Sequence, residues 1–443
     1  MQRKFEKKQE RLYIIADDLT GANDAGVQLT KMGIASTVLL NLDGPVCGEK
    51  KKEVVIVDTD SRAMGEEEAY RTVYQASSFL FKQGFRQVYK KIDSTLRGNI
   101  ATELKAVVAV HKPEIVVVVP SYPKMDRLTL NGIQYVNGEE VSNTEFGRDP
   151  KTPVNNSFIP DLIQSCVSDP VCLVNLETLH DSTEHFIKYI LENIRKQPTW
   201  FICDAQTERD LKKIVKMFAG LKKSIVWAGS AGLIEFLPEA LQLNYQDETF
   251  HPEALSIQKT FTVSASLSGT TKQQLDCVRN LPNAYFIEID PVDLVNHTYD
   301  MQAILRGIST HQEHDHFILF VDSSIQNKER TQRLAQKLSL TKKQISESIV
   351  REISKIAAGV IHVFSNLSGF ILTGGDTAKA VCNQLRIHEI ELCSEIEAGI
   401  PLGKVSGGSR KYWVVTKAGG FGRRESLVNV MNYMIGDVKA YVS

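Results

Sequence analysis

The sequence predicts an α/β protein with two domains, each built on a largely parallel sheet flanked by helices. Short Val/Ile/Leu runs such as Ile115–Val119 alternate with segments of helical periodicity, which is typical of parallel strands covered by helices on both faces. A mostly polar stretch separates two sets of these runs, and 443 residues suffice for two cores. We therefore expect domains over 1–245 and 259–443, a linker over 246–258, and an active site in the cleft between the domains.

In the first domain, the expected strands follow one another with helices between them. The opening apolar run ends at Ala16, and further strands are expected over 35–40, 53–57, 87–92, 115–119, 200–203 and 224–227. Helices are expected around Ala69–Leu80, over 100–110, from a cap at Asp181 to Arg195, and over 207–219. Residues 121–160 break the alternation with a hairpin over 132–141 that turns at Asn137-Gly138, and this excursion is either a lid or a plain surface hairpin.

Three of the first domain's strands run directly into polar clusters, which are Asp17-Asp18, Asp58–Arg62 and Asp93–Arg97. The carboxyl ends of parallel strands lie along one edge of a sheet, so we expect the clusters to converge on one site. Aspartates accept hydrogen bonds from hydroxyls, and an arginine fork matches a carboxylate. The clusters therefore favour a small ligand that carries hydroxyls and a carboxylate, although any one of them alone could be a capped helix start with solvated acids.

The second domain is expected to hold strands over 260–263, 285–289, 317–321, 369–373 and 412–416. Helices are expected over about 271–280 and 341–360, and a rigid turn over 399–403. Two strands end in glycine-rich loops, Gly374–Thr377 and Lys417–Gly422, and a third ends in the hydroxyl-rich turn Ser264–Thr271.

Glycines let a backbone approach a ligand closely, and either Asp376 or Thr377 could cap the helix that follows the first loop. The three loops together suit a nucleotide cradle, whereas a single one could be an ordinary tight turn before a capped helix.

Composition excludes several classes of function. The net charge of −1 gives no electrostatic footprint for nucleic acid or an anionic membrane surface. The seven cysteines form no CxxC or zinc spacing and are expected to be buried free thiols. The basic, polar start is no signal peptide and no run is long enough to span a membrane, so a cytoplasmic protein is expected. No heptad pattern indicates an oligomeric state.

Several motifs together resemble one family, the four-carbon acid sugar kinases. They are Ala16–Ala22, Lys90–Asn99, Thr144–Pro150, Ala228–Leu233, Thr373–Ala378 and Lys417–Gly422, and the resemblance covers nearly the whole chain. It implies ATP-dependent phosphorylation of the terminal hydroxyl of threonate, erythronate, 3-oxo-tetronate or 4-hydroxythreonine. It also implies an N-terminal domain that binds the sugar acid and a C-terminal domain that binds ATP. The nucleotide-binding residues implied by the motif match are Ser264, Gly374, Gly375, Asp376, Thr377 and Gly419.

The resulting hypothesis is a kinase that uses ATP and Mg²⁺, with D-threonate or D-erythronate as the expected substrate. One of Asp17, Asp18 and Asp93 would accept the proton of the attacking hydroxyl, with Asp18 preferred. The expected substrate-binding residues are Arg62, Ser94, Arg97 and Arg127. The alternatives are a 4-hydroxythreonine or 3-oxo-tetronate kinase, or a sugar-acid or nucleotide sensor without turnover. A dehydrogenase is disfavoured because no GxGxxG follows a strand.

Overall fold

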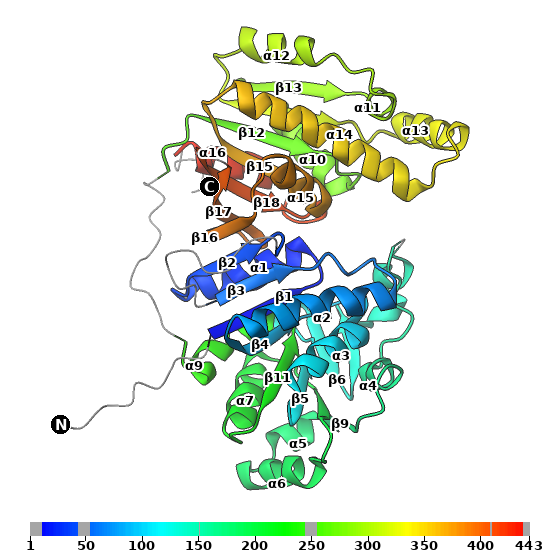
Figure 1. The fold of residues 1–443 in the computed structure, drawn as a ribbon, viewed down its shortest axis with the longest axis vertical. Coiled ribbons are helices and arrows are strands. Elements are labelled where there is room, and N and C mark those ends of the chain that lie inside the picture. The colour runs from blue at the N-terminus through cyan, green and yellow to red at the C-terminus, as the bar shows by residue number, and fades with distance from the viewer. Residues whose placement is uncertain (1–10, 43–53, 150, 244–254, 408–409, 437–443) are drawn as a thin grey trace, which may run out of the picture. The chain divides into compact units, whose positions relative to one another are not determined.

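The chain divides into two compact units, Met1–Asp247 and Glu248–Ser443 (Figure 1). The structure, a computed structural model, describes residues 11–42, 54–149, 151–243, 255–407 and 410–436. Most of the expected linker at 246–258 lies outside these ranges. Each unit is an α/β body in which helices flank largely parallel strands, as predicted.

The sheet of the first unit is parallel throughout. Its strands, in their order across the sheet, are β2 (Ser36–Leu39), β3 (Val54–Asp58), β1 (Arg11–Ala16), β4 (Phe85–Lys91), β11 (Ile225–Gly229), β5 (Ile115–Val119), β10 (Thr199–Cys203) and β9 (Val171–Val174). The helices are α1 (Leu19–Lys31), α2 (Glu66–Lys82), α3 (Ile100–His111), α4 (Ile159–Gln164), α5 (Leu176–His180), α6 (Thr183–Asn193), α7 (Glu208–Ala219), α8 (Ala231–Ile234) and α9 (Leu237–Leu241).

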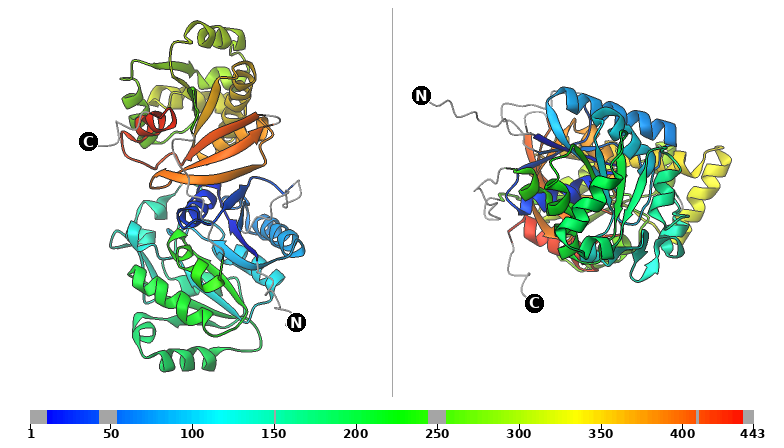
Figure 2. Two further views of the ribbon diagram at one scale, coloured as in Figure 1. Left: turned by 90° about the vertical axis from the view of Figure 1, so that its left-hand side faces the viewer. Right: turned by 90° about the horizontal axis from the view of Figure 1, so that it is seen from below.

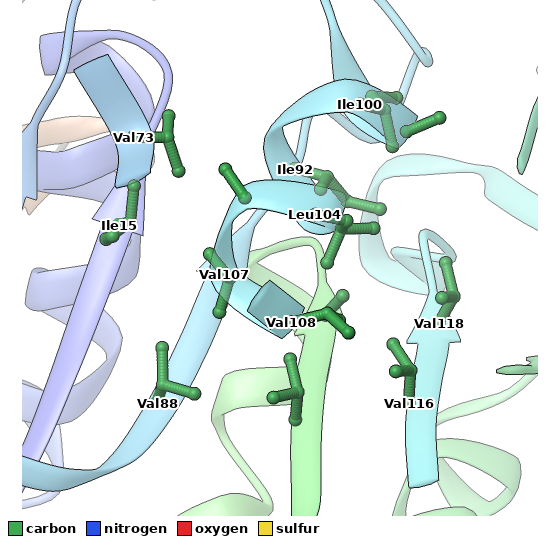
Figure 3. Close-up of a cluster of buried hydrophobic side chains, with 14 of the residues drawn as sticks. Ile15, Val73, Val88, Ile92, Ile100, Leu104, Val107, Val108, Val116 and Val118 are labelled. Carbon is green, nitrogen blue, oxygen red and sulfur yellow. The ribbon is translucent and has the colours of Figure 1, made fainter. Parts of the chain in front are cut away.

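Both faces of this sheet are buried over most of its length, which explains the continuous apolar runs in β1, β3 and β5. In β1, Tyr13 and Ile15 belong to the core cluster beneath α2 and α3, while Leu12 and Ile14 are equally buried on the opposite face. Val88 of β4 and Val116 and Val118 of β5 belong to the same cluster and lie against Leu104 and its neighbours on α3 (Figure 3). Helices therefore lie on both sides of the sheet (Figure 2), and a side chain buried in this way stabilises the fold by roughly 1.5–3 kcal/mol.

The excursion after β5 forms a small antiparallel sheet of β6 (Arg127–Leu130), β7 (Ile133–Val136) and β8 (Glu139–Glu140). The expected turn at Asn137-Gly138 is confirmed, and a second turn at Asn131-Gly132 has the same pair of positive φ angles. Strand β6 was not predicted because it is short and because its alternation is inverted: the polar Thr129 is buried, whereas Leu128 and Leu130 are half-buried. Short 3₁₀ turns, η1 (Pro123–Met125), η2 (Val141–Asn143) and η3 (Glu145–Arg148), flank the sheet.

The sheet of the second unit is parallel over five strands and antiparallel at one edge. In order across the sheet, the strands are β13 (Ala284–Ile289), β14 (His316–Val321), β12 (Lys259–Ser264), β15 (Leu367–Thr373), β18 (Arg410–Lys417), β17 (Ile400–Gly407) and β16 (Glu389–Glu397). The helices are α10 (Gly269–Val278), α11 (Pro291–Asn296), α12 (Met301–Thr310), α13 (Ile325–Lys337), α14 (Lys342–Val363), α15 (Gly375–Gln384) and α16 (Ser426–Met434).

Three local predictions are wrong. The expected rigid turn at 399–403 is a turn only at Gly399, since β17 begins at the next residue. The expected cap Asp181 ends α5, and Ser182 caps α6 by accepting a hydrogen bond from the His185 amide. Helix α15 is capped by neither Asp376 nor Thr377: its N-cap is Gly374 at a φ of 94°, and both residues lie within the first turn. A strand that turns this sharply into a helix needs a positive φ, which glycine adopts most readily.

The six cysteines within the described ranges are free thiols; Cys203 and Cys382 are buried and the other four are half-buried. Cys47 lies outside the described residues. Among the helices that the structure describes, none is long and apolar enough to cross a membrane.

Candidate functional site

The three polar clusters of the first unit meet at adjacent strand ends, as predicted. Strand β1 lies between β3 and β4, so Asp17 and Asp18, Arg62, and Asp93 follow three neighbouring strands. The Arg62 guanidinium holds Asp17 through a two-pronged contact, with Nε 2.8 Å from Oδ2 and Nη2 3.1 Å from Oδ1. Its Nη1 lies 2.7 Å from Asp18 Oδ2 and 4.0 Å from Asp93 Oδ2. One arginine therefore contacts all three predicted catalytic aspartates.

The loops around Arg62 are fixed by local side-chain hydrogen bonds. The Asn99 amide group donates to the carbonyls of Ser61 (3.0 Å) and Met64 (2.9 Å) and so ties the β3 loop to the start of α3. Gly98 has a φ of 92°, and a Cβ there would lie 3.2 Å from Asp17 Oδ2. The close approach of this loop to Asp17 therefore requires glycine.

Asp18 differs from the other two aspartates in exposure and in charge balance. Its Oδ1 caps α1 by accepting from the Gly21 amide at 2.7 Å, and 26% of its side chain is exposed, against 4% for Asp17 and 10% for Asp93. Burial and the neighbouring Asp17 charge raise the pKa of Asp18, against the opposing effect of Arg62. Burial also pushes the pKa of Asp17 upwards, but Arg62 and Lys90 outweigh it and lower that pKa overall.

Asp93 is held ionised by a set of donors on the same loop. Thr95 donates from its amide (3.2 Å) and its hydroxyl (3.0 Å), and Arg97 Nε donates to Oδ2 at 2.6 Å. Burial raises the pKa of Asp93, but Arg62 and Arg97 outweigh it and the pKa ends well below its ordinary value. The carbonyl of Ser94 accepts a hydrogen bond from the Gln134 side chain at 2.7 Å, so this loop also supports the β6–β8 sheet.

Arg97 lies on the loop after β4, and Arg127 begins β6 of the small sheet. Arg97 Nη1 reaches Asp149 Oδ2 at 3.5 Å. Both guanidinium carbons lie over the ring of Phe146, at 5.3 Å for Arg97 and 5.6 Å for Arg127. The substrate-binding residues predicted from the sequence thus lie on the loop after β3 (Arg62), on the loop after β4 (Ser94 and Arg97) and on the excursion (Arg127).

A buried ion pair supports the site and was not predicted. Lys90 Nζ lies 2.7 Å from Glu103 Oε2, and each side chain is only 1% exposed. Burial raises the pKa of Glu103 while Lys90 opposes the rise. The sequence signal was a lysine within the apolar strand β4 and a glutamate on the buried face of α3, but only coordinates pair the two.

The three loops of the second unit also meet at neighbouring strand ends. Ser264, Thr373 and Lys417 are register partners across β12, β15 and β18. The Gly374 amide donates to the Lys417 carbonyl at 2.8 Å, and the Thr271 hydroxyl donates to the Gly419 carbonyl at 2.7 Å. The loops expected to form the nucleotide cradle are therefore hydrogen-bonded to one another.

The predicted nucleotide-binding residues differ in how far they are exposed to solvent. The side chains of Ser264 and Thr377 are buried, at 1% and 2% exposure, whereas Gly374 and Gly375 are half-buried and Asp376 is exposed. A Cβ on Gly419 would lie 2.4 Å from Ser266 Oγ, so glycine is required where this loop packs on the next. A ligand at these strand ends would meet the glycine backbone and the amides of the first turn of α15, which have no acceptor within the helix.

Lys417, which the prediction left out of the binding set, lies beneath the last loop. It is 2% exposed, and its ammonium donates to the carbonyls of Ala418 (2.9 Å), Phe421 (3.0 Å) and Gly419 (3.4 Å). Burial lowers the pKa of Lys417 to about 8. The glycine-rich loop is thus wrapped around a buried positive charge.

Within the described ranges, no group of three or more His, Cys, Asp or Glu side chains is arranged to hold a metal ion. The centre of the aspartate cluster is filled by the Arg62 guanidinium, which occupies the place a cation would take. Mg²⁺ in kinase sites is commonly held by one or two carboxylates and the nucleotide's own phosphates, so this side-chain arrangement fits an ion that arrives with the nucleotide.

Comparison with known proteins agrees with this division of the chain. Residues 12–237 match the model of a sugar-binding N-terminal domain, and residues 261–427 match that of a nucleotide-binding C-terminal domain. A D-threonate kinase of Salmonella typhimurium is 30% identical over 430 residues, covering 96% of this chain and 98% of the relative. A D-erythronate kinase of Heliobacterium modesticaldum is 28% identical over 435 residues, covering 96% and 97%.

A solved structure shows the same fold. The crystal structure of a Haemophilus influenzae protein described as DUF1537 superposes with a TM-score of 0.74 at 20% identity, covering 96% of this chain and 99% of that one. The domain matches, the relatives and the two sets of strand-end loops lead to one conclusion: the chain belongs to the four-carbon acid sugar kinase family.

Proposed function

We propose that this protein transfers the γ-phosphoryl group of ATP to the terminal hydroxyl of a four-carbon sugar acid, with D-threonate or D-erythronate as its preferred substrate. The observation that carries the proposal is the cluster of three aspartates around Arg62 at adjacent strand ends, in a chain that also carries hydrogen-bonded glycine loops. The names of the two relatives support the choice of substrate.

Asp18 is the proton acceptor in this proposal. A general base must reach the hydroxyl and must have a pKa high enough to take its proton. Asp17 is buried and held on both oxygens by Arg62, and Asp93 is saturated by Thr95 and Arg97. Both oxygens of Asp18 are also contacted, Oδ1 by the Gly21 amide and Oδ2 by Arg62 Nη1. Asp18 is nevertheless the most exposed of the three and the one with a raised pKa, so it is best suited to accept the proton.

The second unit holds the nucleotide in this proposal. The backbone at Gly374 and Gly375, the first turn of α15 and the Gly419 loop would hold the phosphates. When bound, ATP supplies the phosphoryl group and Mg²⁺ neutralises its charge, so the protein's own contribution is positioning and charge stabilisation. The hydroxyl held near Asp18 must therefore be brought within reach of the γ-phosphate.

The test is a coupled ATP-consumption assay with Mg²⁺ against D- and L-threonate, D- and L-erythronate, 3-oxo-tetronate and 4-hydroxythreonine. We expect the highest kcat/KM with D-threonate or D-erythronate. Preference for 3-oxo-tetronate or 4-hydroxythreonine would overturn the proposed substrate but not the kinase. Silence on all six acids, with ATP still bound in calorimetry, would instead indicate a sensor.

A second experiment tests the role of Asp18. The variant Asp18→Asn should lower kcat by about 10²- to 10⁴-fold, the usual contribution of a general base, and should leave the Kd for ATP unchanged. Asp161→Asn, on the exposed surface of α4, is the matched control and should behave as wild type. Loss of ATP binding in Asp18→Asn would contradict the assignment of sugar acid and nucleotide to separate units.

A further inference from the structure

The three arginines of the first unit differ in how their charges are balanced. Arg62 contacts Asp17 and Asp18, and Arg97 contacts Asp93 and Asp149. Arg127 forms no ion pair with any carboxylate in the described part of the chain, and its Nη1 donates a hydrogen bond to the Met125 carbonyl at 3.2 Å. Two of the three guanidinium groups are thus neutralised internally, and the third is not.

The surroundings of Arg127 make this imbalance costly. Its Nε is buried without a hydrogen-bond partner, and the guanidinium lies against the Phe146 ring. Burial lowers the pKa of Arg127, although the more distant charges of Asp93 and Glu145 oppose that effect. A partly desolvated cation with an unpaired donor gains from any anion that can reach it.

We propose that Arg127 binds the carboxylate of the substrate and so makes the site select acids over neutral polyols, whereas Arg62 and Arg97 position the aspartates. This inference rests on the proposed function and specifies which arginine recognises the acid. Its chemistry is that of a guanidinium whose Nε donor has no partner, and the planar donor fork of such a group suits a carboxylate. A sugar acid bound in this way would place its charged end at the β6 strand and leave its hydroxyls for the aspartate cluster.

The position of Arg127 in the fold supports this role. It begins β6, whose backbone is anchored to the rest of the unit by Thr129, which exchanges amide and carbonyl hydrogen bonds with Ala205 at 3.1 Å each. The Asp204 carboxylate also accepts from the amides of Asn131 (2.6 Å) and Gly132 (2.8 Å) at the end of the same strand. The guanidinium is therefore carried on a braced strand rather than on a free loop.

The test compares an acid with its neutral amide, using D-threonate and D-threonamide, or the erythronate pair if that acid is preferred. Wild type should favour the acid. Arg127→Met should raise KM for the acid by about 10- to 100-fold, the usual effect of losing a hydrogen bond to a charged group, with kcat much less affected. The ratio of kcat/KM between acid and amide should fall by a similar factor, and Arg127→Lys should recover part of it.

The matched control is Arg148→Met, which removes an exposed positive charge from η3 in the same excursion and should keep the wild-type ratio. A ratio that stays at the wild-type value in Arg127→Met, with the variant folded by circular dichroism, overturns the inference. If Arg127→Met does not fold, Arg127→Gln and Arg127→Lys decide by the same ratio.

Failure of the proposed function gives a different result. In that case wild type turns over no sugar acid, and the Kd for D-threonate from calorimetry replaces KM in the comparison. Binding of the acid that weakens in Arg127→Met would support Arg127 as the anchor in a sensor, and absence of binding by wild type would overturn both proposals.

Discussion

Lys417 allows the most direct test of whether the buried charge beneath the glycine-rich loop lowers the stability of the second unit. Its ammonium is buried beneath the glycine-rich loop and donates to three carbonyls. Each carbonyl also has another donor: the Phe421 amide for Ala418 (3.1 Å), the Thr271 hydroxyl for Gly419 (2.7 Å) and the Gln274 side chain for Phe421 (3.0 Å). Replacing Lys417 by Met would therefore remove a buried charge without leaving any of these carbonyls unpaired.

The size of the effect follows from the pKa of Lys417, which burial lowers from 10.5 to about 8. At about 1.4 kcal/mol per pH unit, that difference corresponds to a cost of about 3 kcal/mol for the charged form in the folded state. Below pH 8 the lysine is protonated in both the folded and the unfolded chain, so the cost is fully present. Between pH 8 and 10.5 the unfolded chain binds more protons, so the free energy of unfolding rises with pH.

We therefore expect Lys417→Met to be more stable than wild type by about 1–3 kcal/mol at pH 7, with the difference shrinking towards zero by pH 10. The assay is urea unfolding at pH 7, 8, 9 and 10, followed by tryptophan fluorescence, to which Trp413 on the same strand contributes. Lys411→Met removes an exposed lysine from that strand and should change stability by less than about 0.5 kcal/mol.

Two results would refute this reasoning. A Lys417→Met variant less stable than wild type at pH 7 would mean that the ammonium hydrogen bonds outweigh the cost of burial. Parallel pH profiles for the two proteins would mean that the Lys417 pKa is not depressed at all. If the variant is more stable but has a raised KM for ATP, the buried charge is retained for the shape of the loop rather than for the fold.

Two further predictions each compare a glycine whose added Cβ would meet neighbouring atoms with a glycine whose added Cβ would meet none. Gly98→Ala should destabilise the first unit by about 1–3 kcal/mol and lower kcat, because the new Cβ would press on Asp17 at 3.2 Å. Gly84 has the same φ of 92°, but a Cβ there would have no atom within 4 Å. Gly84→Ala should therefore cost about 1 kcal/mol and leave kcat unchanged. Gly419→Ala would place a Cβ 2.4 Å from a serine hydroxyl of the neighbouring loop and should raise KM for ATP at least tenfold. Gly420→Ala, whose Cβ would have no atom within 4 Å, should leave KM for ATP unchanged. Equal effects of the two substitutions in either pair would contradict the packing argument.

The convergence of the two sets of loops could be predicted because it depends only on local patterns and on sheet topology. A continuous apolar strand identifies its own carboxyl end, and parallel strands place those ends on one edge. Asp17, Arg62 and Asp93 were expected together for this reason, and they are within contact distance. The same reasoning grouped the three loops of the second domain into one cradle, and in the structure Thr373 and Lys417, at the ends of β15 and β18, are register partners.

What could not be predicted depends on distances between side chains. The sequence offers three arginines as equals, and only the coordinates show that two are paired with aspartates while Arg127 is not. Likewise, nothing in the sequence marks Lys90 as the partner of Glu103. The pair joins a strand to a helix, and no fixed sequence separation identifies such a pair. The predicted cap of α15, Asp376 or Thr377, was wrong because Gly374 adopts a positive φ, and the helix therefore begins at Gly375.

The pairing of Arg62 also explains how three neighbouring aspartates can differ in chemistry. Carboxylates this close raise one another's pKa, and an arginine among them lowers it. Arg62 makes its two-pronged contact with Asp17 and only a single contact with Asp18, so its stabilisation is shared unequally. Asp17 and Asp93 are held ionised, and Asp18 carries the raised pKa. The raised pKa of Asp18, on which its proposed role as proton acceptor depends, is therefore a property of the Arg62-centred cluster and not of Asp18 alone.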